Sequence, residues 1–259
     1  MNIRSLHHAG SVFFWHRHRC ARLKVAVQYC HLERIDEGGG NVTNPIQPLK
    51  QIPKASLVKW TLFLLVVYAL YDGVYVWADS KRLMLDIADV RGGLVPILVL
   101  HIDLPLLIGS VLICLLFGRG QTLAALSIRT RKQLTGMVLG AVVFVVAVYL
   151  KEPASSVAVY EILHALVICG LLEELLFRGL FFSWLDASGC GWLAYLLSGL
   201  AWGAHYGIRT VVVNGTMTFW AVFPMAIFGA VVGSLAALVY KKSDSLWLVA
   251  YLHGTLSLL

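Results

Sequence analysis

Long apolar runs separated by short polar breaks fill the chain from residue 57 to its last residue. Each run is close to the ~20 residues that a helix needs to cross ~30 Å of hydrocarbon. Because lipid offers no partner to backbone N–H and C=O groups, runs of this length predict membrane-spanning helices. We therefore expect an all-α fold, a polytopic transmembrane helix bundle of about seven helices, over residues 57–78, 93–117, 134–150, 157–185, 191–207, 218–240 and 246–259.

The composition agrees with lipid as the surrounding solvent. Hydrophobic residues make up 59% of the chain and charged residues 14%, and the mean hydropathy is +0.77, whereas soluble domains are roughly 45–50% apolar. The formal charge of +7 comes mainly from the N-terminal region and from short loops between apolar runs. That distribution indicates a lipid bilayer rather than nucleic acid as the partner. The five cysteines have no regular spacing and are interpreted as reduced packing residues.

Cations between the runs predict how the chain is oriented in the membrane. One cluster separates the second and third runs, another precedes the last run, and seven crossings put both on the side of the N-terminus. Loops on the cytoplasmic side carry an excess of Lys and Arg, so we expect a multi-pass protein of the cell membrane with a cytoplasmic N-terminus. The clusters are Arg119, Arg129, Arg131 and Lys132, and Lys241 and Lys242.

The chain divides into three segments by composition. Residues 1–55 are rich in Arg and His and then in Gly, Asn and Pro, without a sustained period, which predicts a disordered cytosolic tail. Residues 56–118 hold the first two apolar runs, so they are expected to form two N-terminal transmembrane helices. Residues 119–259 hold the other five, with several titratable side chains inside them.

Three charges interrupt the apolar run in "CGLLEELLFRGLFF", which extends from Cys169 to Phe182. Glu174 and Arg178 are spaced i, i+4, so on a helix they can form a charge-assisted pair. Glu173 points about 100° away from Glu174 on an α-helix and has no cation one turn later. The alternative is a helix anchor whose charges reach the headgroups. The run would be roughly 43 Å long as one α-helix, so we expect strong tilt or a break near Gly170.

Two histidines lie in later apolar runs, His205 in "SGLAWGAHYG" and His253 in "LVAYLHGTLS". Counting residues from the turn near Ala187–Cys190 places Glu173 and His205 at the same depth. Counting from the break before the last run places His253 shallower by roughly 10 Å, if every helix is straight and upright.

Other features of the runs are expected to serve packing. His101 and Asp103 in the second run, and Glu161 and His164 in the fourth, predict interhelical pairs or residues near the interface, with a proton path as the functional alternative. The glycine pairs Gly199-x-x-x-Gly203 and Gly229-x-x-x-Gly233 predict close helix contact.

The motif Glu173-Glu174-x-x-x-Arg178, followed by a histidine in the next run and another in a later run, resembles the CAAX-protease and bacteriocin-processing family of intramembrane endopeptidases, also called Abi or type II CAAX prenyl endopeptidases. The resemblance covers about residues 120–259, and "EELLFRG" is its most specific part. It implies that residues 119–259 form an intramembrane peptidase core. The chain departs from the family pattern at Ala201, where Phe is usual, and at Ser257, where Asn is usual.

The resemblance implies a hydrolase similar to CAAX prenyl protease 2. Its implied catalytic residues are Glu173, Glu174, Arg178, His205 and His253, with Ser257 at the position of oxyanion support. Hydrolysis of an amide by a glutamate needs a base for water and donors for the oxyanion, and Glu173 is expected to be that base. No cofactor is expected. The metal alternative uses Glu173, His205 and His253 as Zn²⁺ ligands.

The expected function is thus a glutamate-dependent intramembrane endopeptidase that cleaves a peptide bond near the cytoplasmic face. Its partner is a peptide or protein substrate, either prenylated or a bacteriocin-type precursor. The alternative is a non-catalytic membrane protein of the same fold, a scaffold or a bacteriocin self-immunity protein, which the departures at Ala201 and Ser257 favour. A proton-coupled transporter is less favoured, because no inverted repeat of broken segments is visible.

Overall fold

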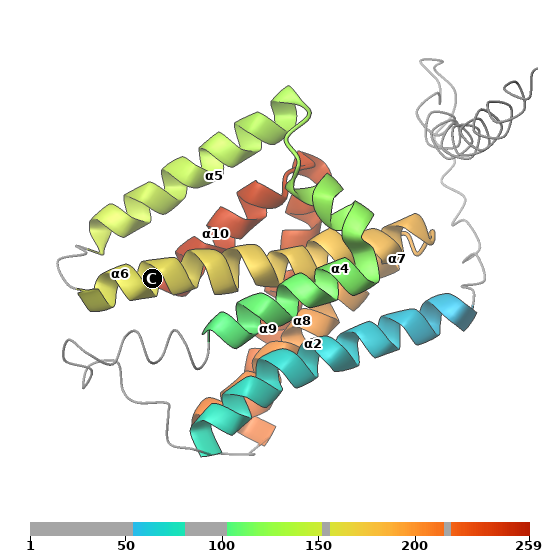
Figure 1. Cartoon of the computed structure of the whole chain (residues 1–259), viewed down its shortest axis with the longest axis horizontal. Helices are drawn as coiled ribbons and strands as arrows, with labels where there is room; N and C mark the ends of the chain where they lie inside the picture. The colour runs from blue at the N-terminus through green and yellow to red at the C-terminus, as the bar shows by residue number, and fades with distance from the viewer. Residues whose placement is uncertain (1–53, 81–102, 152–155, 215–218) are drawn as a thin grey trace, which may run out of the picture. The chain divides into compact units, whose positions relative to one another are not determined.

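The structure is a computed structural model of the chain, and it describes residues 54–80, 103–151, 156–214 and 219–259. Within these ranges the chain forms helices joined by short turns, and no strand occurs among them (Figure 1). The all-α prediction is confirmed. The predicted tail of residues 1–55 lies outside the described residues, apart from its last two positions.

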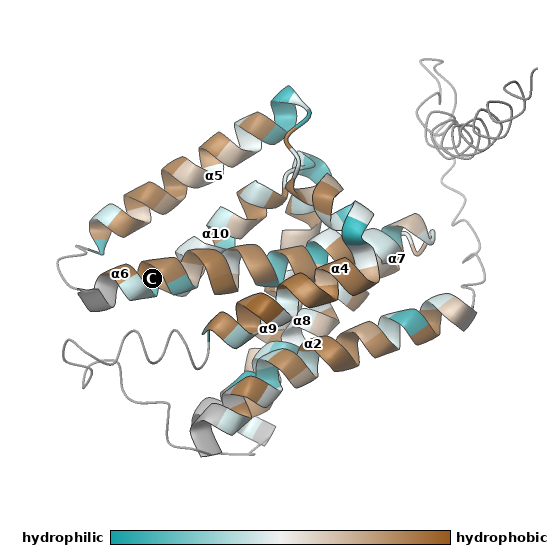
Figure 2. Ribbon diagram, viewed as in Figure 1, coloured by the Kyte–Doolittle hydropathy of each residue, from teal (hydrophilic) through white to brown (hydrophobic). Residues whose placement is uncertain are grey.

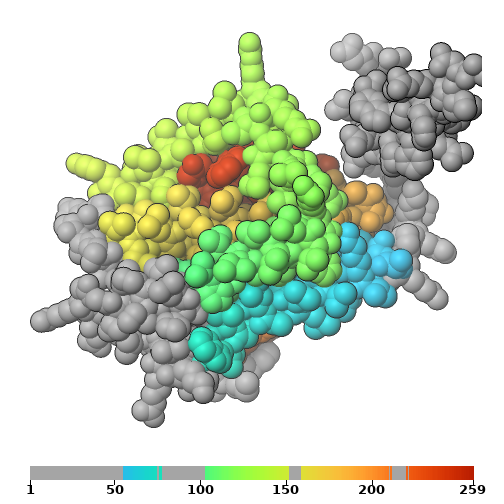
Figure 3. All heavy atoms as spheres, viewed as in Figure 1, coloured from blue at the N-terminus to red at the C-terminus, as the bar shows by residue number. Residues whose placement is uncertain are grey.

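The described part forms seven helices when the uninterrupted stretch from Ser156 to Ala187 is counted as one. They are α2 (Lys54–Ser80), α4 (Leu104–Leu126), α5 (Arg131–Leu150), the stretch α6–η3–η4–α7 (Ser156–Leu163, His164–Glu173, Leu175–Phe182 and Ser183–Ala187), α8 (Trp192–Asn214), α9 (Phe219–Ser243) and α10 (Leu246–Leu258). Four segments are long and apolar enough to cross a membrane, namely Ala55–Val74, Leu104–Leu126, Arg131–Leu150 and Val222–Ser243, and α10 is apolar but shorter. Figure 2 shows that hydrophobic residues dominate these helices, and Figure 3 shows α2 and α4 in contact on one face of the described part.

Helix α4 extends past the predicted end of its apolar run. It begins after Asp103, with a proline in its first turn, and its backbone kinks at Gly118, where φ is −162° and ψ is 42°. The helix then continues to Leu126, nine residues beyond the predicted end at residue 117. The apolar run ends at the kink because polar residues follow it, but those residues still favour a helix. The first ten residues of the predicted run, 93–102, lie outside the described residues.

The two cation clusters lie at the same end of the bundle. Helix α5 begins with a capping box in which Thr130 and Gln133 exchange hydrogen bonds of 3.1 Å. The Gln133 amide also donates to Asp244, in the turn between α9 and α10, at 3.0 Å. The side of the membrane that this end faces stays a prediction.

The long helix changes its hydrogen-bond pattern where the site residues begin. Segment α6 is α-helical, η3 and η4 are π-helical, and α7 is α-helical again. The i→i+5 bonds of a π-helix place more residues in each turn, so successive residues rotate and rise less than in an α-helix. Of the two predicted alternatives, strong tilt or a break near Gly170, the break does not occur, because the helix widens there instead. Tilt relative to a membrane stays a prediction.

Helix α10 lies between α5 and the widened segment η3 (Figure 1). The approach is so close that a Cβ atom at Gly170 would lie 2.5 Å from the Ala250 carbonyl oxygen. A Cβ atom at Gly254 would lie 3.0 Å from the Ala165 carbonyl oxygen. Glycine at these two positions therefore lets α10 bring its side chains against η3.

Helices α8 and α9 pack through the predicted glycine pairs. A Cβ atom at Gly203 would lie 2.3 Å from the Ala226 carbonyl oxygen, and one at Gly199 would lie 2.4 Å from that of Ala230. The prediction of close helix contact at these glycines is confirmed.

Two of the predicted polar pairs are present. Asp103 Oδ1 lies 3.0 Å from His164 Nδ1, between the start of α4 and the start of η3. Glu161 pairs with Lys151 at 3.1 Å. The interpretation of these side chains as interhelical pairs is confirmed, whereas His101 lies outside the described residues.

Aromatic rings and thiols fill the core of the described bundle. The Phe63 ring on α2 packs edge-on against Trp184 on α7, with 5.0 Å between the ring centroids. Cys114, Cys169 and Cys190 are buried and free, which agrees with their interpretation as packing residues.

Candidate active site

Glu174 and Arg178 form the predicted pair on the widened helix. Arg178 Nη1 lies 3.0 Å from Glu174 Oε1, and both side chains are fully buried. Arg178 also donates to the Gly233 carbonyl oxygen on α9 at 3.2 Å, and its guanidinium lies 4.8 Å from the centre of the Trp202 ring. The charges are paired inside the protein, so the interpretation as a helix anchor at the headgroups does not fit these two residues.

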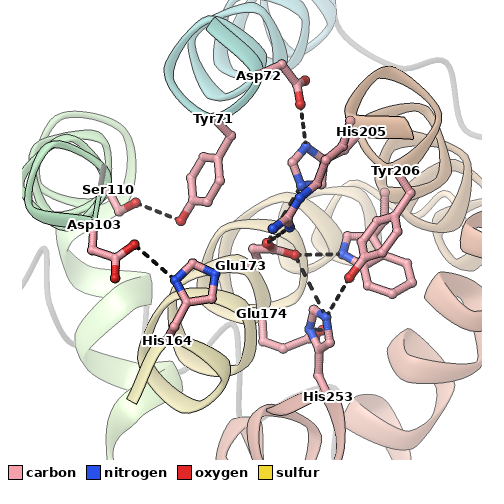
Figure 4. Close-up of polar contacts among 12 residues, drawn as sticks. Tyr71, Asp72, Asp103, Ser110, His164, Glu173, Glu174, His205, Tyr206 and His253 are labelled. Atoms are coloured by element: carbon pink, nitrogen blue, oxygen red, sulfur yellow. Dashed lines mark hydrogen bonds and ion pairs between the residues drawn. The ribbon is translucent and has the colours of Figure 1, made fainter. Parts of the chain in front are cut away.

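Glu173 is also fully buried, with an exposed fraction of 0%. Its Oε1 atom lies 3.6 Å from Arg209 Nη1 and 3.7 Å from His205 Nε2. Its Oε2 atom accepts a hydrogen bond of 3.4 Å from Trp202 Nε1 and lies 3.9 Å from His253 Nε2. Sequence spacing supplies no local cation for Glu173, but α8 supplies His205 and Arg209, and α10 supplies His253. Figure 4 shows the two histidines beside the glutamates.

His253 contacts both glutamates. Its Nδ1 atom lies 2.9 Å from Glu174 Oε1, and its Nε2 atom lies 3.0 Å from the Tyr206 hydroxyl oxygen. The predicted depth mismatch of roughly 10 Å between His253 and Glu173 is therefore wrong. The count assumed straight, regular α-helices, whereas the helix that carries Glu173 is π-helical over η3 and η4.

His205 lies level with Glu173, as the residue count predicts. Its ring is fully buried, and its Nδ1 atom lies 3.0 Å from Asp72 Oδ1 on α2. The Tyr71 ring packs edge-on against the imidazole, with 5.7 Å between the centroids. Figure 4 shows the ring of His205 between Asp72 and the glutamates.

Sequence reasoning missed four residues around the glutamates, namely Asp72, Trp202, Tyr206 and Arg209. Asp72 carried a usable signal, because a carboxylate inside an apolar span is itself unusual. Arg209 follows His205 by one helical turn, so the two share a face of α8. Trp202 and Tyr206 carried no signal, since aromatic side chains in a membrane helix most often pack in the core.

Ser257 does not join this cluster. It lies on an exposed part of α10, one turn after His253. Ala201, the other departure from the family pattern, is buried, and its carbonyl oxygen accepts a hydrogen bond of 2.8 Å from Tyr68 on α2. The role of the Ser257 hydroxyl in oxyanion support stays a prediction.

The predicted metal alternative can be tested on the same geometry. Zinc with ligands at 2.0–2.2 Å in a tetrahedron would hold its ligand atoms about 3.3 Å apart. The nearest imidazole nitrogens are 3.7 and 3.9 Å from different oxygens of Glu173, and the nitrogen of His253 already contacts Tyr206. No group of three His, Cys, Asp or Glu side chains in the described ranges is arranged to hold a metal ion. As they stand, Glu173, His205 and His253 do not fit a zinc ion.

Comparison with known proteins identifies the part of the chain that carries this cluster. Residues 154–259 match a family model described as type II CAAX prenyl endopeptidase Rce1-like. No curated protein matches the chain, and no solved structure does. The matched stretch includes both glutamates, Arg178 and both histidines, and the family supports a membrane endopeptidase acting on a peptide or protein. The match of residues 154–259 to the type II CAAX prenyl endopeptidase Rce1-like family model confirms the family resemblance that the motif predicted.

Proposed function

We propose that this protein is a glutamate-dependent intramembrane endopeptidase in which Glu173 is the base. One observation carries the proposal. The Glu173 carboxylate is fully buried, yet Glu174 beside it takes the strong ion pair with Arg178. Glu173 instead faces His205, Arg209 and His253 across 3.6 to 3.9 Å. Those separations exceed a hydrogen bond, and reacting groups are often this far apart before substrate binds.

The gap between Glu173 and His205 suits a reacting water molecule. Glu173 Oε1 and His205 Nε2 are buried, and neither has a hydrogen-bond partner among the residues that the structure describes. Polar atoms 3.7 Å apart can share a bridging water. A water donating to both atoms has its lone pairs free for a substrate carbonyl carbon.

The proton balance then follows. Glu173 removes a proton from the water as the oxygen bonds to the carbonyl carbon, which gives a tetrahedral oxyanion. The protonated Glu173 gives its proton to the amide nitrogen as the C–N bond breaks. The products are a carboxylic acid and an amine, and the carboxylate of Glu173 is regenerated.

The oxyanion needs a donor, and the exposed Ser257 is a weaker candidate than Arg209. Arg209 reaches the same oxygen of Glu173 from α8, and its side chain is 22% exposed, so it lies at the edge of the cluster. A guanidinium in this position can stabilise negative charge on the substrate oxygen. We assign that role to Arg209 and assign to Glu174, Arg178 and His253 the role of fixing the helices around the base.

The test is cleavage of a peptide library by the purified protein in lipid nanodiscs. Glu173→Gln keeps the volume and removes the base, so we expect loss of cleavage by roughly 10²–10⁴-fold or more. Glu161→Gln is the matched control, because Glu161 lies on the same long helix and pairs with Lys151 away from the cluster. Equal cleavage by wild type and Glu173→Gln would overturn the assignment.

Two further experiments test whether cleavage needs zinc and which class of peptide is the substrate. Cleavage that stops with a zinc chelator and returns with added Zn²⁺ would support the metal alternative, and unaffected cleavage supports the metal-free reaction. Prenylated and unprenylated versions of the same peptide, beside a bacteriocin-type precursor, distinguish the substrate classes that the motif implies.

The second candidate is a non-catalytic membrane protein of the same fold, a scaffold or a bacteriocin self-immunity protein. The exposed position of Ser257 favours it, because the family's usual amide donor is missing there. It predicts that wild type and Glu173→Gln are equally inactive and equally protective in cells exposed to a bacteriocin.

A further inference from the structure

We propose that Asp72, on a helix before the matched residues 154–259, is a positioning residue that sets the tautomer of His205, an inference that rests on the proposed peptidase function. Asp72 Oδ1 lies 3.0 Å from His205 Nδ1, with 5% of Asp72 and none of His205 exposed. A carboxylate against Nδ1 accepts a hydrogen bond from it, so the proton of the neutral ring is held on Nδ1.

The other ring nitrogen is the one that faces the base. His205 Nε2 lies 3.7 Å from Glu173 Oε1. With Nδ1 protonated, Nε2 carries a lone pair and can accept a hydrogen bond from the reacting water. With the opposite tautomer, Nε2–H would donate toward Glu173 and occupy the oxygen that must take the proton. The orientation of the water thus depends on Asp72, although Asp72 touches neither the water nor the substrate.

Helix α2 is fixed in place for this contact. Tyr68, Tyr71 and Asp72 share one face of the helix, since they are spaced i, i+3 and i+4. Tyr68 donates to the Ala201 carbonyl oxygen on α8, one turn before His205, at 2.8 Å. The Tyr71 hydroxyl lies 3.0 Å from Ser110 Oγ on α4. Contacts to two different helices therefore hold the carboxylate against the ring.

A second Asp–His pair supplies an internal comparison. Asp103 Oδ1 and His164 Nδ1 are also 3.0 Å apart, so the two pairs match in atoms and distance. Among the described residues, however, His164 makes no ion pair with Glu173 or Glu174, whereas His205 does. A merely structural role would make the two aspartates equivalent, and a positioning role makes only Asp72 matter for the reaction.

The experiment compares Asp72→Asn, Asp103→Asn and wild type as full-length protein in lipid nanodiscs. Nitrogen NMR of histidine-labelled protein reports which ring nitrogen carries the proton, and the His205 signal is the one lost in His205→Gln. Cleavage of the best library peptide gives kcat and KM for each variant.

We expect Nδ1 of His205 to carry the proton in wild type and in Asp103→Asn, and to lose it in Asp72→Asn, where the amide donates to the ring. For Asp72→Asn we expect kcat to fall at least about 100-fold with KM within about twofold, and Asp103→Asn to keep both. An unprotonated Nδ1 or a protonated Nε2 in wild type would overturn the proposal even if Asp72→Asn failed to fold. Unchanged kcat in a folded Asp72→Asn would overturn it too. If wild type cleaves no peptide, the peptidase function fails, and the NMR comparison still decides whether Asp72 sets the ring.

Discussion

Gly170 and Ala250 meet where the widened helix contacts α10, with room for a hydrogen but not for a methyl group. A Cβ atom at Gly170 would lie 2.5 Å from the Ala250 carbonyl oxygen. That oxygen belongs to a helix backbone and cannot turn away as a side chain could. The contact holds α10 at the distance from which His253 reaches both glutamates.

Gly170→Ala should therefore displace α10. We expect the free energy of unfolding to fall by about 1–3 kcal/mol, as for other over-packed sites, and cleavage to fall as well. Thermal unfolding in detergent measures the first effect. The control is Gly120→Ala on α4, where a Cβ atom meets nothing within 4 Å and alanine favours the helix. Equal melting temperatures for the two variants would contradict the close contact.

The two adjacent glutamates should fail in different ways when changed. Glu174→Gln leaves Arg178 buried without its counter-charge, which costs on the order of 3–5 kcal/mol for a buried pair. Glu173→Gln should stop cleavage while the protein folds normally. Changing Arg178 to Gln in the Glu174→Gln background should restore part of the stability, because the unpaired charge is then gone. Yield of folded protein and melting temperature are measured for the three variants and for wild type. The same loss of stability for both glutamates, with cleavage per folded molecule unchanged, would return this stretch to a structural role.

Cysteine labelling of whole cells should decide the orientation. An introduced cysteine at Ser243 should react only from the cytoplasm, and one at Asn214 only from outside. Cys20 and Cys30 must first be replaced. Cys190 can stay, since burial and the nearby Asp186 raise the pKa of its thiol and so reduce its reaction with the label. Labelling in the reverse pattern would place the cation clusters outside the cell.

The sequence predicted the helices and the ion pair of Glu174 with Arg178, because both depend on residues that are close in the sequence. Apolar length indicates a span, and i, i+4 spacing pairs Glu174 with Arg178. The surroundings of Glu173 depend instead on contacts between distant helices. The π-helical turns of η3 and η4 depart from the α-helical spacing on which a residue count rests, so the count could not place His253. Asp72 is 133 positions from His205, and the local sequence around either residue does not predict its contact with the other.

The Asp72–His205 contact joins two parts of the chain that a search by family would treat separately. Natural selection would act on positions 72 and 205 together, so related chains that change one should change the other. The contact also means that residues 154–259 cannot be joined to other leading helices without loss of this carboxylate. A chimaera joining residues 154–259 to a different pair of leading helices would keep the full glutamate and histidine motif, yet it would lose the carboxylate that holds one of those rings.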